Sequence, residues 1–361
     1  MGQATITHAE VSFLAHTLDK PMGGSGVSQV DLILADIGTS DGARGVGFSY
    51  VIAGGGRFVA ERAAALADRF LHGQPLAPAP AHWRDISKSF NRTGPGVNLV
   101  ALAALDLALW DLDARRRDVP LATALGGEAR SVPVYGSGGF APAMAPAAAA
   151  EQAVAHVEAG FKGVKPRVGG VPADAAMIRA VCDVVGDKAW VMADMNEKGD
   201  PSRAQWFCRL AAEHGLRFVE EPLPAGDMTA YRRLSANVSV ALATGEHHQG
   251  VGAFSALLTD NIAGIVQPDL AMVGGLTPAL KIVHLAEALG AEVMPHFLPS
   301  LFVHLAAVSP AVTMLEDFPL LEPLFGEHAA VRDGMIKPDA SKAGHGIRLA
   351  PALLKNATVL A

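Results

Sequence analysis

The stretch MIRAVCDVVGDKAWVMADMN, residues 177–196, joins a helical pattern, a glycine and a short apolar run that ends in a carboxylate. Its apolar residues recur at helical spacing up to Val185, and Gly186 is a typical helix stop. Residues 189–194 are typical of a buried strand and end at Asp194. A helix closed by glycine and followed by a buried strand is the repeating unit of a parallel α/β sheet.

The same unit recurs along the chain from about residue 130. Three further helical patterns end at Gly160, Gly215 and Gly290, and each is followed by a short apolar run. A polar residue closes each predicted strand, at intervals of 20 to 30 residues: Tyr135, Lys165, Asp194, Glu220, Glu246, Asp269, His296 and Glu316. Eight such strands predict an α/β barrel of the TIM type, in which all strand carboxyl ends open on one face, the mouth.

The first 125 residues follow a different pattern. Strand patterns cover 6–18 and 29–51, and helical patterns cover 58–73 and 97–117. We therefore predict an α+β domain over residues 1–125, a barrel over 126–325, and a segment over 326–361 that returns to the first domain. The glycine-rich segments 20–28 and 53–57 match no phosphate-binding loop, so we expect mobile lids over the mouth.

The composition limits the partners of the chain. The net charge is −7, and the only basic run is Arg115 to Arg117, which argues against nucleic-acid binding. Half of the residues are apolar and only 18% are charged, so we expect either a homo-oligomer or an alanine-rich barrel that absorbs the apolar surplus. A small polar ligand fits this composition better than a macromolecule.

The compartment is predicted from the cysteines and from apolar runs. Cys182 and Cys208 both fall in helical patterns, which favours reduced thiols in a cytosolic protein. Neither a basic and apolar leader nor a run of 18 apolar residues occurs. We expect a soluble cytoplasmic protein without a membrane partner.

Three carboxylates close consecutive predicted strands, namely Asp194, Glu220 and Glu246. One carboxylate at a strand end is usually a solvated residue or a helix cap. Three gathered at one mouth repel one another, by roughly 4 kcal/mol for two charges about 4 Å apart at an effective dielectric constant of 20. A cation between them relieves this repulsion, and ligands that are all oxygen favour Mg²⁺, with Mn²⁺ as the alternative.

Asp269 and His296 close the next two strands. An aspartate that accepts from one imidazole nitrogen fixes the tautomer and leaves the other nitrogen to take a proton. The alternative is a histidine that is only hydrogen-bonded at the barrel mouth. His247 is a further candidate for substrate contact.

Lys165 and Arg167 point the same way from the second strand, because side chains alternate with period two. Either could bind a substrate carboxylate, but a guanidinium cannot act as a base. Glu316 could bond the same carboxylate if it is protonated, or it could form a salt bridge with Lys165.

These motifs together resemble the enolase superfamily and, within it, the mandelate racemase subgroup. The matching segments span nearly the whole chain: the helical linker at 101–127, DMN at 194–196, EEP at 220–222, GE at 245–246, PD with GG and Thr at 268–277, and PH at 295–296. The resemblance implies a (β/α)7β barrel under an α+β capping domain. It also implies abstraction of the α-proton of a carboxylate substrate, giving an enediolate held by Mg²⁺.

The resemblance implies a role for each candidate residue. Asp194, Glu220 and Glu246 would bind the metal, Asp269 and His296 would form the base, and Glu316 would be the electrophilic partner of the substrate carboxylate. The segments 16–28 and 50–58 would be specificity loops. Substrate contacts would come from Arg167, Asn196, His247, Lys20 and His16, with Glu221 beside them.

One departure from the resembled pattern separates the possible reactions. The racemases carry Lys-x-Lys on the second strand, with the second lysine as a base opposite the histidine. This chain has Lys165, Pro166 and Arg167. We therefore predict a lyase that dehydrates an acid sugar to a 2-keto-3-deoxy acid. The alternatives are a racemase, epimerase or cycloisomerase with Lys165 as opposite base, and more remotely a non-catalytic binding protein.

Overall fold

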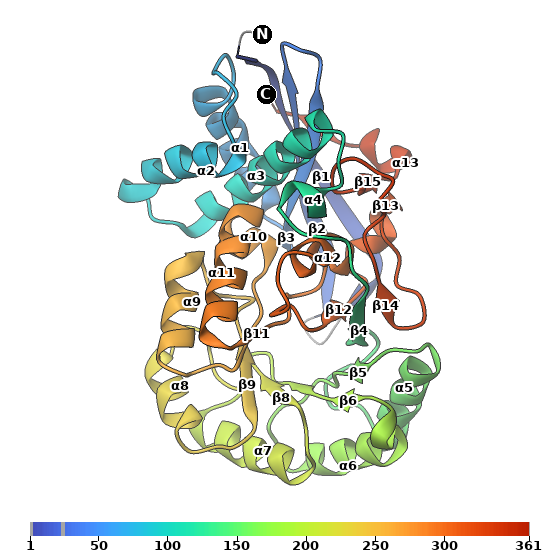
Figure 1. Ribbon diagram of the computed structural model, residues 1–361. Helices are drawn as coiled ribbons and strands as arrows, with labels where there is room; N and C mark the ends of the chain where they lie inside the picture. Colours follow the sequence, from blue (N-terminus) through green and yellow to red (C-terminus); the bar gives the residue numbers. More distant parts are fainter. Residues whose placement is uncertain (1–2, 23–25, 361) are drawn as a thin grey trace.

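The computed structural model describes residues 3–22 and 26–360, which form an upper α+β layer and a ring of strands surrounded by helices (Figure 1). The upper layer is an antiparallel sheet with strand order β16-β1-β2-β3. Its strands are β1 (Ile6–Met22), β2 (Val27–Thr39), β3 (Arg44–Ile52) and β16 (Thr358–Val359). The helices of this part are α1 (Gly56–Phe70), α2 (Ala79–Ser87), the 3-10 helix η1 (Lys88–Arg92) and α3 (Gly96–Arg116).

Helix α3 lies directly on strand β3, and two glycines make this approach possible. A Cβ atom on Gly45 would lie 2.3 Å from the backbone nitrogen of Leu112, and one on Gly47 would lie 2.3 Å from the carbonyl oxygen of Ala104. Because side chains alternate along a strand, these glycines place the neighbouring even-numbered residues of β3 on the opposite face. That face includes Tyr50 and is turned toward the barrel.

The second part of the chain alternates strands and helices. The strands are β4 (Val132–Gly136), β5 (Gly163–Val164), β6 (Trp190–Val191), β7 (Ala193–Asp194), β8 (Phe218–Glu220), β9 (Ala241–Thr244), β10 (Ile265–Val266), β11 (Glu292–Val293) and β12 (Leu315–Asp317). The helices are α4 (Leu121–Ala124), α5 (Pro146–Glu158), α6 (Ala173–Val185), η2 (Gly186–Lys188), α7 (Pro201–Glu213), α8 (Met228–Ser235), α9 (Gly250–Thr259), α10 (Leu270–Val273), α11 (Leu276–Leu289) and α12 (Pro299–Ala306).

These strands pair in parallel around a ring. One run has the order β12-β4-β5-β6 and the other β11-β10-β9-β8-β7, with only Met192 between β6 and β7. Parallel bridges from Arg167 to Asp194 and from Val293 to Val312 join the two runs. The resulting barrel has its own buried cluster, with side chains from around the ring: Tyr135, Met192, Phe218, Ala243, Ile265, Met294 and Met314.

The predicted helix stops are confirmed by the backbone. Gly160, Gly215 and Gly290 have φ angles of 86°, 69° and 70°, the left-handed conformation that ends a helix most easily at glycine. Gly186 also has a positive φ of 52° and begins η2. The cysteines are free, as predicted. No helix in the described part of the chain is long and apolar enough to cross a membrane.

The C-terminal segment crosses from the barrel to the first sheet. It contains η3 (Glu322–Leu324), β13 (Phe325–Glu327), β14 (Met335–Ile336), β15 (Arg348–Leu349) and α13 (Pro351–Leu354). Strand β14 pairs with β4 of the barrel, and β16 pairs with β1 of the first sheet. The end of the described chain therefore lies against its beginning (Figure 1).

Parts of the segments predicted to be lids or specificity loops have regular strand structure, and their role at the mouth stays a prediction. Residues 16–22 belong to β1, where His16 pairs with Val30, and residues 50–52 belong to β3. Antiparallel pairing with β2 supplies the backbone hydrogen bonds that an irregular lid would lack. Within these segments, residues 23–25 lie outside the described part of the chain.

Candidate active site

Most of the predicted residues meet at the carboxyl ends of the barrel strands. Register places Asp194 of β7 beside Glu220 of β8, and Glu246 follows β9 after the turn at Gly245. Tyr135 belongs to the buried cluster of the barrel interior, and its ring centre lies 5.5 Å from the ammonium group of Lys165.

Each of the three predicted metal ligands has a basic partner within the chain. The pairs are Asp194 with Arg167 at 3.4 Å, Glu220 with Lys165 at 2.6 Å, and Glu246 with His296 at 3.3 Å. These internal cations offset the repulsion that three neighbouring carboxylates would otherwise have. In the described part of the chain, the donor atoms of the three carboxylates do not all lie within 4.8 Å of one another. Their role as metal ligands stays a prediction.

Glu220 carries the clearest sign of an incomplete site. Its Oε2 accepts from Lys165 and from the amide of Gln267, both at 2.6 Å, whereas its buried Oε1 has no hydrogen-bond partner. Burial raises the pKa of Glu220 well above its usual range, although Lys165 opposes this shift. A buried carboxylate oxygen without a donor is costly. The oxygen donors here suit a hard divalent cation, so the residues present fit Mg²⁺ or Mn²⁺.

Lys165 joins two buried carboxylates, Glu220 and Glu316, the second at 2.8 Å. Burial lowers the pKa of Lys165, but the two carboxylates outweigh it and hold the pKa well above its usual range. Burial raises the pKa of Glu316, but Lys165 and His296 outweigh it and bring the pKa to about 2. Glu316 is therefore an ionised salt-bridge partner, the second of the two possibilities open from the sequence, and not a protonated acid.

The Asp269 and His296 side chains form the predicted pair. Nδ1 of His296 lies 2.8 Å from Oδ2 of Asp269. An ionised carboxylate only accepts, so Nδ1 carries the proton and Nε2 is turned toward Glu246. Burial lowers the pKa of His296, but Glu246 and Asp269 outweigh it and raise the pKa to about 10. The sequence left open a histidine that is merely hydrogen-bonded at the mouth. The structure instead shows an imidazole that is oriented by Asp269.

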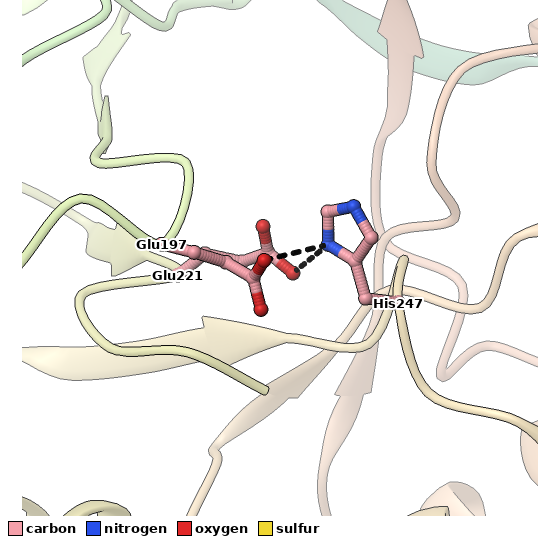
Figure 2. Close-up of side chains that lie close together, drawn as sticks. All are labelled: Glu197, Glu221 and His247. Carbon is pink, nitrogen blue, oxygen red and sulfur yellow. Dashed lines mark hydrogen bonds and ion pairs between the residues drawn. The ribbon is translucent and has the colours of Figure 1, made fainter. Parts of the chain in front are cut away.

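Figure 2 shows a second group of side chains, which follow the predicted ligands by one to three residues in the sequence. This group consists of Glu197, Glu221 and His247, whose donor atoms lie within 4.8 Å of one another and could hold a metal ion. Nδ1 of His247 lies 2.8 Å from Oε1 of Glu221 and 4.0 Å from Glu197. The hydrogen bond to Glu221 is the largest of the influences that raise the pKa of His247 to about 9. The sequence indicated no partner for His247, and in the structure that partner is Glu221.

A cavity of about 360 Å³ opens at this end of the barrel. Its barrel side is formed by Arg167, Asn196, His247 and His296, and its other side includes Ile52 of the first domain. Arg167 also hydrogen-bonds the side-chain oxygen of Asn196 and stacks on Phe318. A larger hollow of about 690 Å³ lies at the opposite ends of the strands, beside Trp190 and Arg217, away from the predicted site residues.

One predicted substrate contact, His16, is not among the described residues that line this cavity, and a second, Lys20, cannot be placed. His16 is half-buried on β1, and the described lining of the cavity includes Val27 and Ile52 from the first domain but not His16. The side chain of Lys20 lies outside the described part of the chain. His16 pairs with Val30, which in turn pairs with Ile52 of the cavity lining, so its role as a substrate contact stays a prediction.

The structure adds residues that the sequence did not single out. Ser137 donates to Glu316 at 2.6 Å, and the backbone N–H of Phe297 donates to the other oxygen of Glu316 at 3.0 Å. Tyr50 donates to Asp269 at 2.5 Å from the first domain. Ser137 follows a strand end and could have been found by that position. Nothing local marks Tyr50, whose contact spans 219 residues.

The fold and the site together define a class of protein, a capped α/β barrel with acidic and basic side chains at its mouth. Residues 9–126 match the family model of the mandelate racemase and muconate lactonizing enzyme N-terminal domain, and residues 148–353 match the enolase C-terminal domain-like model. The chain belongs to the enolase superfamily, in its mandelate racemase subgroup.

The similar proteins include dehydratases and a cycloisomerase. An L-talarate/galactarate dehydratase of Salmonella typhimurium LT2 is 34% identical over 85% of this chain and 78% of its own length. A 3,6-anhydro-alpha-L-galactonate cycloisomerase of Streptomyces coelicolor A3(2) is 30% identical over 88% of this chain and 89% of its own. The crystal structure of L-talarate dehydratase from Polaromonas sp. JS666, complexed with Mg and L-glucarate, has a TM-score of 0.91 and 32% identity, covering 98% of each chain.

Proposed function

We propose that this protein is a (β/α)7β-barrel lyase that uses Mg²⁺, with Mn²⁺ as an alternative, to dehydrate an acid sugar to a 2-keto-3-deoxy acid. Its domains in this proposal are a capping domain over 1–125, a barrel over 126–325 and a returning segment over 326–361. The dehydratase relatives at 30 to 34% identity support the reaction class. The substrate is a small carboxylate, as the ligand of the Polaromonas enzyme is.

Asp194, Glu220 and Glu246 would hold the metal ion in this proposal. The unpartnered Oε1 of Glu220 supports this assignment, as does a donor set made only of oxygen. When bound, the ion neutralises the charge that develops on the substrate carboxylate as its α-proton leaves. Without such neutralisation an α-proton is far too weakly acidic for an imidazole.

His296 would take the α-proton at Nε2, because Asp269 holds the proton on Nδ1. This role needs a neutral imidazole. The charge of Glu246 is the largest influence that raises the pKa of His296, so Glu246 would have to hold the metal ion instead of pairing with Nε2. The electron pair of the broken C–H bond moves into the carboxylate, which gives an enediolate. This electron pair then returns and expels the hydroxyl group at C3. His296 gives its proton to the leaving oxygen, which departs as water. One imidazole thus serves as base and then as acid, and the enol product tautomerises to the 2-keto acid.

The main support for the dehydratase proposal is that Lys165 and Arg167 both remain protonated cations. Lys165 is 1% exposed and paired with two carboxylates, which keeps it protonated. Arg167 remains a cation, since its pKa is raised further: burial lowers it, but Asp194 and other carboxylates outweigh burial. Arg167 lines the cavity and is suited to hold a substrate carboxylate, and neither cation is suited to remove a proton. Two-sided proton transfer would require a second base.

The alternative is a racemase, epimerase or cycloisomerase on the same scaffold. The Streptomyces cycloisomerase, at 30% identity, favours it. Lys165 would have to act as the opposite base, and its two ion pairs oppose that role. A non-catalytic binding protein is a more remote candidate, and the hydrogen-bonded base pair of Asp269 and His296 argues against it.

The proposal is tested with the protein, Mg²⁺ and a panel of aldonic and aldaric acids in D₂O, followed by proton NMR. We expect a 2-keto-3-deoxy product from at least one acid. The proposal fails if α-deuterium accumulates in substrate of inverted configuration and no keto-deoxy acid forms. Absence of Mg²⁺ binding by calorimetry in the wild-type protein would instead favour the binding-protein alternative.

A further inference from the structure

Tyr50 of β3 extends from the capping domain to the predicted base of the barrel. It is 4% exposed, and its hydroxyl donates to Oδ2 of Asp269 at 2.5 Å. Burial raises the pKa of Tyr50 well above its usual range, with the charge of Asp269 adding to the effect, so the hydroxyl keeps its proton. The same strand face carries Ile52, which lines the active-site cavity, whereas Tyr50 is not among the described residues of that lining.

The carboxylate of Asp269 is held by four donors. Oδ1 accepts from the backbone N–H groups of Ala271 and Met272, at 2.9 and 3.0 Å, and so caps α10. Oδ2 accepts from Tyr50 and from Nδ1 of His296. Only the Tyr50 bond comes from the capping domain, and it shares its acceptor atom with the imidazole. A change in that bond therefore acts directly on the oxygen that orients His296.

The ring of Tyr50 also contacts the segment that carries the imidazole. Its centre lies 5.0 Å from that of Phe297, whose ring in turn packs edge-on against His296 at 4.7 Å. Phe297 and Leu298 have positive φ angles of 33° and 50°, a conformation that side-chain-bearing residues adopt only when their surroundings hold it. Both are fully buried. Tyr50 is thus one of the contacts that hold this strained turn.

We propose that Tyr50 is a positioning residue for the proton-transfer step, through which the docked capping domain fixes the Asp269 and His296 pair. This inference rests on the proposed function for its reaction, but its geometry does not depend on the substrate. The hydroxyl of Tyr50 locks the Asp269 carboxylate in the plane that suits Nδ1, and its ring limits rotation of the His296 segment. The base is then complete only when β3 lies against the barrel.

The test compares Tyr50→Phe with Ser49→Ala. Phenylalanine keeps the ring contact with Phe297 and removes only the donor to Asp269. Ser49 is the neighbouring residue on β3, also fully buried, and its hydroxyl has no hydrogen-bond partner, so its removal is a matched control. We expect Tyr50→Phe to lower kcat by about tenfold or more, the scale of lost supporting hydrogen bonds at a site, with KM changed by less than about twofold. Ser49→Ala should leave both constants near wild type.

A second readout needs no substrate. In protein labelled with ¹⁵N-histidine, the proton on Nδ1 of His296 reports its hydrogen bond to Asp269. We expect its resonance to move in Tyr50→Phe and to stay in Ser49→Ala. An unchanged resonance with unchanged kcat would overturn the inference, as would a raised KM with unchanged kcat, which would place Tyr50 in substrate binding.

The inference on Tyr50 stays testable in two further cases. If Tyr50→Phe does not fold, 3-fluorotyrosine at position 50 keeps the shape and strengthens the donor, and an unmoved resonance there would overturn the inference. If the wild-type protein converts no acid sugar, the proposed function fails. The resonance still decides whether Tyr50 acts on His296.

Discussion

Two buried acidic clusters of this molecule differ in how completely they are satisfied. At the junction of α3, β3 and the C-terminal segment, both oxygens of Asp111 have donors: the backbone N–H groups of Val46 and His345 at 3.0 and 2.9 Å, and Arg115 at 2.7 Å. At the barrel mouth, by contrast, several buried side-chain atoms lack partners, namely Oε1 of Glu220, Oε2 of Glu221, Nε of Arg167 and Oε1 of Gln267.

This difference separates a structural cluster from a functional one. Buried polar groups are nearly always hydrogen-bonded, so a group of unpartnered buried atoms is typical of a ligand-binding site. The Asp111 cluster joins three parts of the chain, and both carboxylate oxygens of Asp111 accept hydrogen bonds. The mouth cluster has more carboxylates than basic groups, and several of its donors and acceptors have no partner. We therefore expect changes at the mouth to affect binding and reaction, and changes at Asp111 to affect folding.

The largest expected effect is at the mouth. Replacing His296 with asparagine removes the proposed base while keeping a side chain that can hydrogen-bond Asp269. We expect kcat to fall by about 10²- to 10⁴-fold, the usual contribution of general acid–base catalysis, and thermal unfolding to change little. Retained activity in His296→Asn, with keto-acid formation as the readout, would remove His296 from the reaction.

The matching change at the structural cluster is Asp111→Asn. An amide places an N–H group where donors already point, and it leaves Arg115 without its charged partner. We expect a loss of about 3 kcal/mol in the free energy of unfolding, as for other broken buried pairs, measured by urea denaturation. The control is Asp113→Asn on the same helix, where an exposed pair with Arg117 should contribute less than about 1 kcal/mol. Equal effects of the two changes would contradict the comparison.

His304 makes the same interface dependent on pH. Its Nδ1 accepts from the backbone N–H of Ala122 at 3.2 Å, and Nε2 donates to the carbonyl of His345 at 3.1 Å, so the ring must be neutral. Burial lowers its pKa from 6.5 to about 4. Because the unfolded chain binds the proton more readily, the stabilisation is fully present above about pH 6.5 and is lost as the pH falls toward 4. The difference of about 2.5 pKa units corresponds to about 3 kcal/mol.

Urea denaturation at pH 7.5 and pH 5 measures this dependence. We expect the loss of stability on acidification to be smaller in His304→Gln than in the wild-type protein. His284→Gln is the control, since His284 is exposed on α11. An unchanged pH dependence in His304→Gln would show that His304 does not titrate in this way.

The smallest expected effect is that of Arg167→Lys, which gives the second strand the Lys-x-Lys pattern. A lysine at this position can lose its proton, which arginine cannot. We expect the variant to exchange the α-proton of substrate with solvent from the side opposite His296, seen as slow deuterium incorporation with inversion. If the wild-type protein already shows this exchange at the same rate, the absence of a second base does not explain the reaction.

The strand ends and the base pair could be predicted from the sequence because they follow local periods. Glycines at the ends of the helical patterns predicted the helix ends, and the regular interval between polar strand-end residues predicted the barrel. The complete set of partners could not be predicted, since it depends on side-chain direction. The Lys165–Glu316 salt bridge was one of the predicted possibilities, whereas the pairing of Lys165 with Glu220 was not predicted. Tyr50 was missed because its acceptor lies in another part of the fold.

The central claim is that a divalent cation completes the mouth through Asp194, Glu220 and Glu246. Calorimetric titration with Mg²⁺ tests it most directly when Glu220→Gln is compared with Glu197→Gln, which belongs to the group shown in Figure 2. We predict that binding is lost in Glu220→Gln and kept in Glu197→Gln. Binding kept in Glu220→Gln and lost in Glu197→Gln would place the ion at Glu197, Glu221 and His247 and contradict this account.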